Sequence, residues 1–148
     1  MKVLNQTKRV IALFVLATLV LSASAQCKNA AKEAIKKLAP YTHTGEVNSM
    51  TLVLGEPSTV HLSFYKGLNY KIQVGAEGTV GTVNFRIVDE NNQEIYNSKT
   101  GKSSSFEFYS NSSQELVIEI VSDDKSKQGC AVVVVGMQMP KTNSIRNL

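Results

Sequence analysis

Leu68-Asn-Tyr-Lys-Ile-Gln-Val74 is the stretch of sequence that most clearly indicates the fold of this chain. Apolar side chains occupy every second position in it, and polar side chains lie between them. Because successive side chains of a β-strand point to opposite faces, this alternation predicts a strand with one buried face.

The same two-residue period continues on both sides of this stretch, interrupted by turn signals such as Gly55-Glu-Pro-Ser58. It predicts about eight strands, near residues 50–54, 60–65, 68–74, 83–87, 94–96, 106–109, 116–121 and 131–135. We therefore expect an all-β fold, an antiparallel β-sandwich of the jelly-roll type. The segment Ala131–Val135 is apolar on both faces, which predicts a central strand. The expected core consists of Leu52, Leu54, Val60, Leu62, Phe64, Tyr70, Ile72, Val74, Val83, Phe85, Ile87, Phe106, Phe108, Leu116, Ile118, Ile120, Val133 and Val135.

The period changes to that of a helix before residue 45. Apolar residues recur from Ala31 to Leu38 at the spacing of one helical face, so we predict a short helix over 27–38. Pro40 ends it, because a proline disfavours helical geometry in the residue before it.

The N-terminal 25 residues have the features of an export signal. A positive segment precedes the apolar run Val10–Leu21, and Ala23-Ser-Ala25 supplies small residues at the cleavage position. We expect cleavage after Ala25; a retained anchor helix and a lipidated Cys27 are the alternatives. The expected organisation is a signal peptide (1–25), a helix and link (26–45), a β-sandwich domain (46–139) and a polar tail (140–148). The mature chain is expected to be secreted or periplasmic, with no transmembrane segment.

The net charge and the numbers of histidines and cysteines exclude some kinds of partner and metal site. The formal charge of +4 falls to +1 without Lys2, Lys8 and Arg9, so we expect no nucleic-acid partner. Two His and two Cys argue against a multi-histidine or cysteine-rich metal centre. In an exported chain, Cys27 and Cys130 are predicted to form a structural disulfide.

A resemblance supports the same picture. The strands Leu68–Val74, Val83–Asp89, Ser105–Phe108 and Glu115–Ile120 resemble those of bacterial pre-peptidase C-terminal domains, over roughly residues 50–136. Those domains are jelly-roll-like sandwiches attached to secreted enzymes. The resemblance implies export and an accessory or binding role, and it carries over no catalytic residue.

The sequence contains no nucleophile elbow, no zinc-protease motif and no phosphate-binding loop. His43 and His61 have no partner evident from their spacing. We therefore expect a non-enzymatic accessory or binding module of the cell envelope, whose partner is a protein or glycan surface. The alternatives are a carbohydrate-binding module and a small secreted hydrolase. A cleft that joins His43 or His61 to carboxylates would favour the hydrolase.

Two weaker signals concern ligands. The acidic loops offer oxygen atoms for calcium at Asp89, Glu90, Asn91, Asp123 and Asp124, although no spaced calcium motif is present and no cofactor is otherwise expected. Exposed tyrosines can stack on sugars, and the predicted outward or edge positions are Tyr65, Tyr96 and Tyr109.

Overall fold

The computed structural model describes residues 22–53 and 55–140 of the chain. Their elements, in order, are α2 (Ser22–Lys36), β1 (Thr42–Leu52), β2 (Ser58–Phe64), β3 (Asn69–Ala76), β4 (Val83–Val88), β5 (Glu94–Asn97), α3 (Ser98–Gly101), β6 (Ser105–Tyr109), β7 (Gln114–Ser122) and β8 (Gly129–Gln138). Within these residues the strands form two antiparallel sheets, ordered β1-β8-β3-β6 and β2-β7-β4-β5. The predicted β-sandwich is confirmed.

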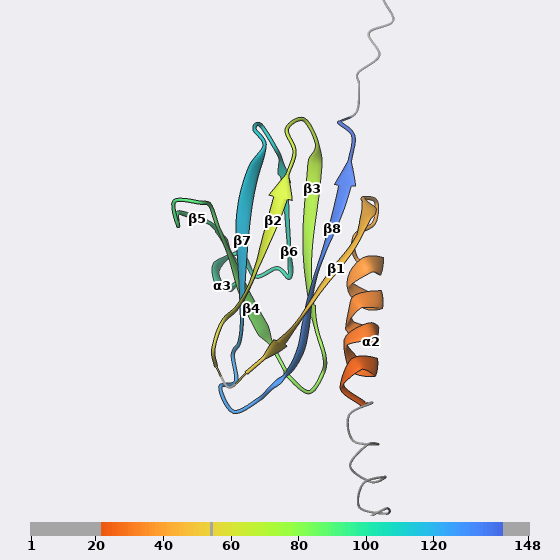
Figure 1. The fold of residues 1–148 in the computed structure, drawn as a ribbon, viewed down its shortest axis with the longest axis vertical. Helices are drawn as coiled ribbons and strands as arrows, with labels where there is room; N and C mark the ends of the chain where they lie inside the picture. The colour runs from red at the N-terminus through yellow and green to blue at the C-terminus, as the bar shows by residue number, and fades with distance from the viewer. Residues whose placement is uncertain (1–21, 54, 141–148) are drawn as a thin grey trace, which may run out of the picture.

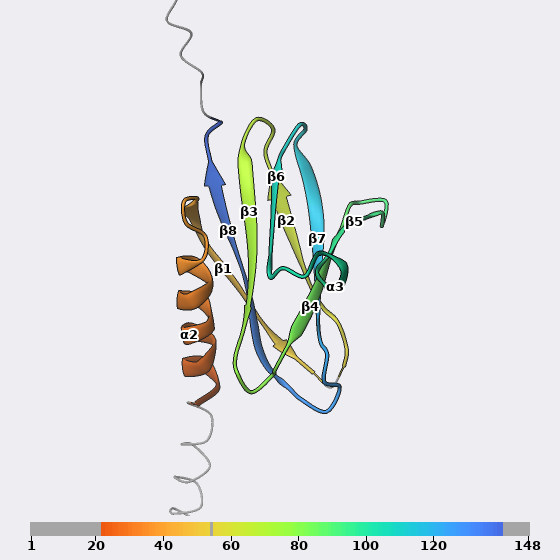
Figure 2. The same cartoon turned by 180° about the vertical axis from the view of Figure 1, so that it is seen from behind.

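The strand order is that of a jelly roll. The chain passes from one sheet to the other at nearly every connection, and β4 and β5 form a hairpin within one sheet. Figures 1 and 2 show the two sheets face to face, with α2 outside one of them. The order leaves β1 and β2 at one side of the sandwich, and β6 and β5 at the other.

The predicted core is confirmed for every described member. All of these side chains are buried or pack against the buried cluster between the sheets. Leu54 lies outside the described residues. The prediction missed Val80, which is fully buried although it belongs to the glycine-rich loop after β3.

The segment Ala131–Val135 lies in β8, between β1 and β3, which confirms the predicted central strand. Its two faces are covered differently. Ala131, Val133 and Val135 face the sandwich core, whereas Val132 and Val134 pack under α2.

The helix is held against this sheet in two ways. Ala30, Ala34 and Leu38 contact the outer valines of β8, and a Cβ on Gly75 would lie 3.1 Å from the Ala30 carbonyl oxygen. A larger residue would therefore push the helix away. The predicted disulfide is confirmed: Cys27 and Cys130 are bonded, with their Cα atoms 5.4 Å apart.

Several predicted boundaries were wrong. Helix α2 spans Ser22–Lys36 rather than 27–38, and β1 begins at Thr42, inside the predicted link. The sequence did not predict the first part of β1, because this part is polar and lacks alternation. It forms a strand by pairing with β8. A bulge interrupts the pairing between His43 and Val47, where Gly45 has φ of 95°. The single-turn helix α3 was not predicted.

Two predicted segments lie outside the described residues: the signal segment up to residue 21, and the tail from residue 141. No helix in the described ranges is long and apolar enough to cross a membrane.

Neighbouring residues of β4 test the predicted face assignment. Phe85 is 2% exposed and Arg86 points to solvent. Phe85→Ala should lower the free energy of unfolding by about 3–5 kcal/mol because it leaves a cavity. Arg86→Ala should lower it far less, because it breaks only a surface ion pair. Urea denaturation of both variants measures the difference, and equal losses would contradict the register of β4.

Candidate functional site

The edge strands β1 and β2 lie at the same side of the sandwich (Figure 1). An open groove lies between them. Its volume is about 480 Å³. The floor is apolar and consists of Leu62, Phe64, Leu68, Tyr70 and Val135. The rim is mostly polar and consists of Thr44, Glu46, Asn48, His61, Ser63, Tyr65 and Met137. We term this site the edge groove. Its size and its apolar floor with a few polar groups are typical of ligand-binding clefts, which measure about 300–1,000 Å³.

Asn48 places an amide at the mouth of this groove. It shares its strand face with Met50 and Leu52, which pack against the core, so its side chain points inward. Its Nδ2 atom is buried and has no hydrogen-bond partner among the described residues. A buried donor without a partner costs about 1–3 kcal/mol. Asn48 is therefore a candidate binding residue that sequence reasoning missed, because β1 was predicted to start after it.

His61 has a carboxylate partner that its sequence position did not reveal. The His61 Nδ1 atom lies 2.8 Å from Glu115 Oε1 on the neighbouring strand β7. The register pairs Ser63 with Glu115, which brings this carboxylate diagonally opposite His61. Both side chains are largely in solvent, 62% and 55% exposed respectively. The predicted outward direction of His61 is confirmed, and its carboxylate partner was not evident from the sequence.

His43 has a structural contact. Its Nε2 atom lies 3.1 Å from the Glu46 carbonyl oxygen, across the bulge of β1. The contact holds the bent backbone next to the groove, where Glu46 contributes the rim's carboxylate.

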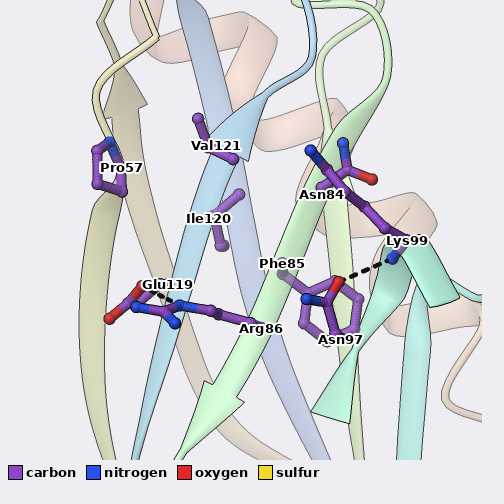
Figure 3. Close-up of a pocket in the computed structure, with 9 residues that line it drawn as sticks. All are labelled: Pro57, Asn84, Phe85, Arg86, Asn97, Lys99, Glu119, Ile120 and Val121. Atoms are coloured by element: carbon purple, nitrogen blue, oxygen red, sulfur yellow. Dashed lines mark hydrogen bonds and ion pairs between the residues drawn. The ribbon is translucent and has the colours of Figure 1, made fainter. Parts of the chain in front are cut away.

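A second, smaller hollow lies on the outer face of the β2-β7-β4-β5 sheet, which α2 does not cover. It has a volume of about 180 Å³ and lies between Pro57, β7, β4 and Lys99. Figure 3 shows Arg86 extended toward Glu119 across its surface, with Phe85 behind the strand. Arg86 Nε lies 2.5 Å from Glu119 Oε2, and this hydrogen bond raises the pKa of Arg86. The charges satisfy each other, which makes this hollow a weaker candidate than the edge groove.

Carboxylates in the acidic loops already interact with neighbouring residues of the same loops. Asp89 Oδ1 accepts hydrogen bonds from the backbone amides of Asn91 and Gln93, closing the β4–β5 turn. Hydrogen bonds from Ser126 lower the pKa of Asp124, and the Lys127 ammonium adds to this effect.

The structure does not bring the predicted calcium ligands together. Asp89 and Glu90 follow the end of β4, whereas Asp123 follows Ser122, which pairs with the first residue of β4. Asp123 is already engaged by the Asn84 amide and Lys99. No cluster of three or more His, Cys, Asp or Glu residues suited to a metal exists in the described part of the chain.

The three tyrosines do not form one platform. Tyr65 and Tyr109 are 67% and 48% exposed, but Tyr65 follows β2 in one sheet and Tyr109 belongs to β6 in the other. Tyr96 lies on the edge strand β5, but its side chain is partly buried and packs against the core. Its ring packs between Phe85 and Phe106, and its hydroxyl donates to the Ser103 carbonyl oxygen. Tyr96 faces inward because it pairs with Ile87, which is fully buried on the inner face of β4.

Two buried amides give a paired stability test. Asn48→Leu should raise the free energy of unfolding by about 1 kcal/mol, because it removes the orphan donor. Gln73→Leu should lower it by about 1–3 kcal/mol, because the buried Gln73 Nε2 donates to the carbonyl oxygens of Val74 and Ser104. The midpoint of urea denaturation measures both. A loss of stability in Asn48→Leu equal to that in Gln73→Leu would show that the Asn48 amide is satisfied in solution.

No family model and no curated protein sequence matches this chain, so the resemblance to pre-peptidase C-terminal domains stays a prediction. Among solved structures, the chain is similar to PliG of Aeromonas hydrophila, a periplasmic inhibitor of g-type lysozyme. The similarity has a TM-score of 0.50 and 11% sequence identity, over 67% of this chain and 89% of that chain. At this identity it shows a shared β-sandwich fold.

Proposed function

We propose that this protein is exported and acts, without catalysis, by binding a partner protein through the edge groove. The observation that carries the proposal is the groove itself, whose apolar floor and polar rim lie open between two edge strands. Concave sites with an apolar lining and a few polar groups at the rim are typical of binding sites.

Two further observations support export and protein binding. A disulfide such as Cys27–Cys130 is rare in reducing compartments, which fits the targeting features of the N-terminal segment. The structurally similar PliG is itself a periplasmic protein that inhibits an enzyme. Inhibition requires contact with another protein but no chemistry by the inhibitor, and the proposal assigns the same mode of action to this chain.

A small hydrolase is the second candidate, and the His61–Glu115 pair favours it. A histidine oriented by a carboxylate is one part of an acid–base site, and Ser63 lies two residues away on the same strand face. However, the structure gives no hydrogen bond between the Ser63 hydroxyl and the His61 ring among the described residues. Both members of the pair are also more than half exposed, whereas general acid–base groups work best when shielded from water.

Site-specific photo-crosslinking tests the binding proposal. Tyr65 on the groove rim is replaced by the photoreactive residue p-benzoylphenylalanine, in the organism that produces the protein. Ile95 is the control position, because it is 42% exposed and lies on β5, at the other side of the sandwich. We expect the Tyr65 variant to give a discrete, protease-sensitive crosslinked species that the Ile95 variant lacks.

Two outcomes of this experiment count against the proposal. A crosslinked species that is sensitive to glycosidase and resistant to protease would identify a glycan partner. Equal crosslinking from both positions would show that the edge groove is not the contact surface.

A turnover assay tests the hydrolase candidate. Wild type, His61→Ala and Glu115→Gln are compared on peptide, ester and glycoside substrates. We expect no turnover above background by any of them, because the pair lacks a bonded nucleophile. Turnover by wild type that is lost in both variants would establish the hydrolase in place of the binding module.

A further inference from the structure

One edge of β1 carries backbone groups that pair with no neighbouring strand in the described part of the chain. There, β1 pairs with β8 on one side and with no strand on the other. The Ser58 hydroxyl donates to the Thr51 carbonyl oxygen at 3.0 Å, so the backbone of Thr51 points away from β8. Backbone groups of an antiparallel strand change direction at each residue, and those of Val47 and Ser49 therefore point the same way. Neither makes a backbone hydrogen bond on that side within the described residues.

This free edge borders the edge groove. Asn48 lies between Val47 and Ser49, and its side chain points inward at the mouth of the groove. A strand added beside β1 would place alternate side chains over the apolar floor. The Asn48 Nδ2 atom is buried and has no partner among the described residues, and a turn of this side chain toward the added strand would let it donate to a peptide oxygen.

The rim of the groove favours a basic side chain of the partner. Glu46 is exposed and is the carboxylate among the lining residues. Nearby, Glu115 holds the ring of His61. A Lys or Arg of the partner would be attracted to this rim, and an acidic side chain would be repelled.

We propose that the edge groove binds an extended peptide segment of the partner, which adds a strand to the free edge of β1. The segment presents one large apolar side chain to the groove floor and a Lys or Arg to Glu46. Main-chain hydrogen bonds supply affinity in this mode of recognition, and the alternate side chains supply specificity. This inference rests on the proposed function and names the chemistry of the partner.

The probe for the test is a random library of ten-residue linear peptides displayed on phage and selected on the purified, disulfide-bonded protein. We expect enriched peptides to share a large apolar residue with Lys or Arg within about two positions, the spacing of one strand face. The best peptide is then synthesised, and its affinity is measured by fluorescence anisotropy.

Strand addition has a signature in the peptide backbone. N-methylation at alternate residues of one parity should weaken binding by about tenfold or more, because it removes N–H donors that pair with β1. Methylation at the other parity should change affinity by less than about threefold, because those N–H groups point away from β1. Equal effects at both parities would overturn the proposal.

Variants of the protein locate the peptide. Asn48→Leu should weaken binding by about tenfold through loss of the amide donor. Glu46→Gln should weaken it by about threefold and reduce its dependence on salt, since exposed ion pairs contribute little. Glu90→Gln, an exposed carboxylate in the distant β4–β5 turn, is the control and should bind like wild type.

The outcomes separate this inference from the proposed function. If no peptide is enriched, or if Asn48→Leu binds the selected peptide normally, while Tyr65 still crosslinks a partner protein, strand addition is wrong and the binding function stands. If Tyr65 crosslinks no protein and no peptide is enriched, both are wrong.

Discussion

The arrangement of this molecule depends on the burial of both faces of β8. A strand that is apolar on both sides must be covered on both sides, because exposed apolar surface opposes folding. The second sheet covers the inner face, and α2 covers Val132 and Val134 on the outer face. The helix can approach closely because Gly75 has no side chain, and the Cys27–Cys130 disulfide ties its N-terminal part to β8 itself.

This requirement makes the sandwich asymmetric. One sheet is closed off by α2, whereas the outer face of the other sheet carries cross-strand ion pairs such as Arg86–Glu119. Charges that satisfy each other across strands suit that face to contact with solvent. The position of β8 in the middle of its sheet also places β1 at the edge, opposite the edge strand β2. The edge groove lies between these two edge strands.

The groove contains features that do not serve stability. A leucine in place of Asn48 would continue the inward apolar face of β1, yet the chain has an amide there whose donor is unpartnered. Long exposed edges are also a liability, because they pair with other chains. The bulge between His43 and Val47 interrupts this edge and limits its free part to a short stretch. A locally unfavourable residue beside a short free edge is typical of a binding site, where stability is lower than the fold would allow.

Much of the fold was determined by the sequence alone, because strand alternation is a local property. The alternation in residues 68–74 and in the other strands identified the side chains that face inward, and the described core agrees with it. The Cys27–Cys130 pair was likewise evident, since these are the two cysteines of a chain with export features. By contrast, β1 before residue 50 has no alternation and forms only because β8 pairs with it.

The site was decided by the tertiary structure. Which strands lie at the edges depends on strand order, which residue spacing does not encode, so neither the groove nor the free edge of β1 was visible in the sequence. His61 and Glu115 are brought together by the β2–β7 register, and Asn48 faces inward only once β1 extends past it. Tyr96, expected at an outward or edge position, packs partly buried against the core because the β4–β5 pairing places it opposite Ile87. Local periodicity determines which face a side chain occupies; long-range pairing determines which faces and edges are left for a partner.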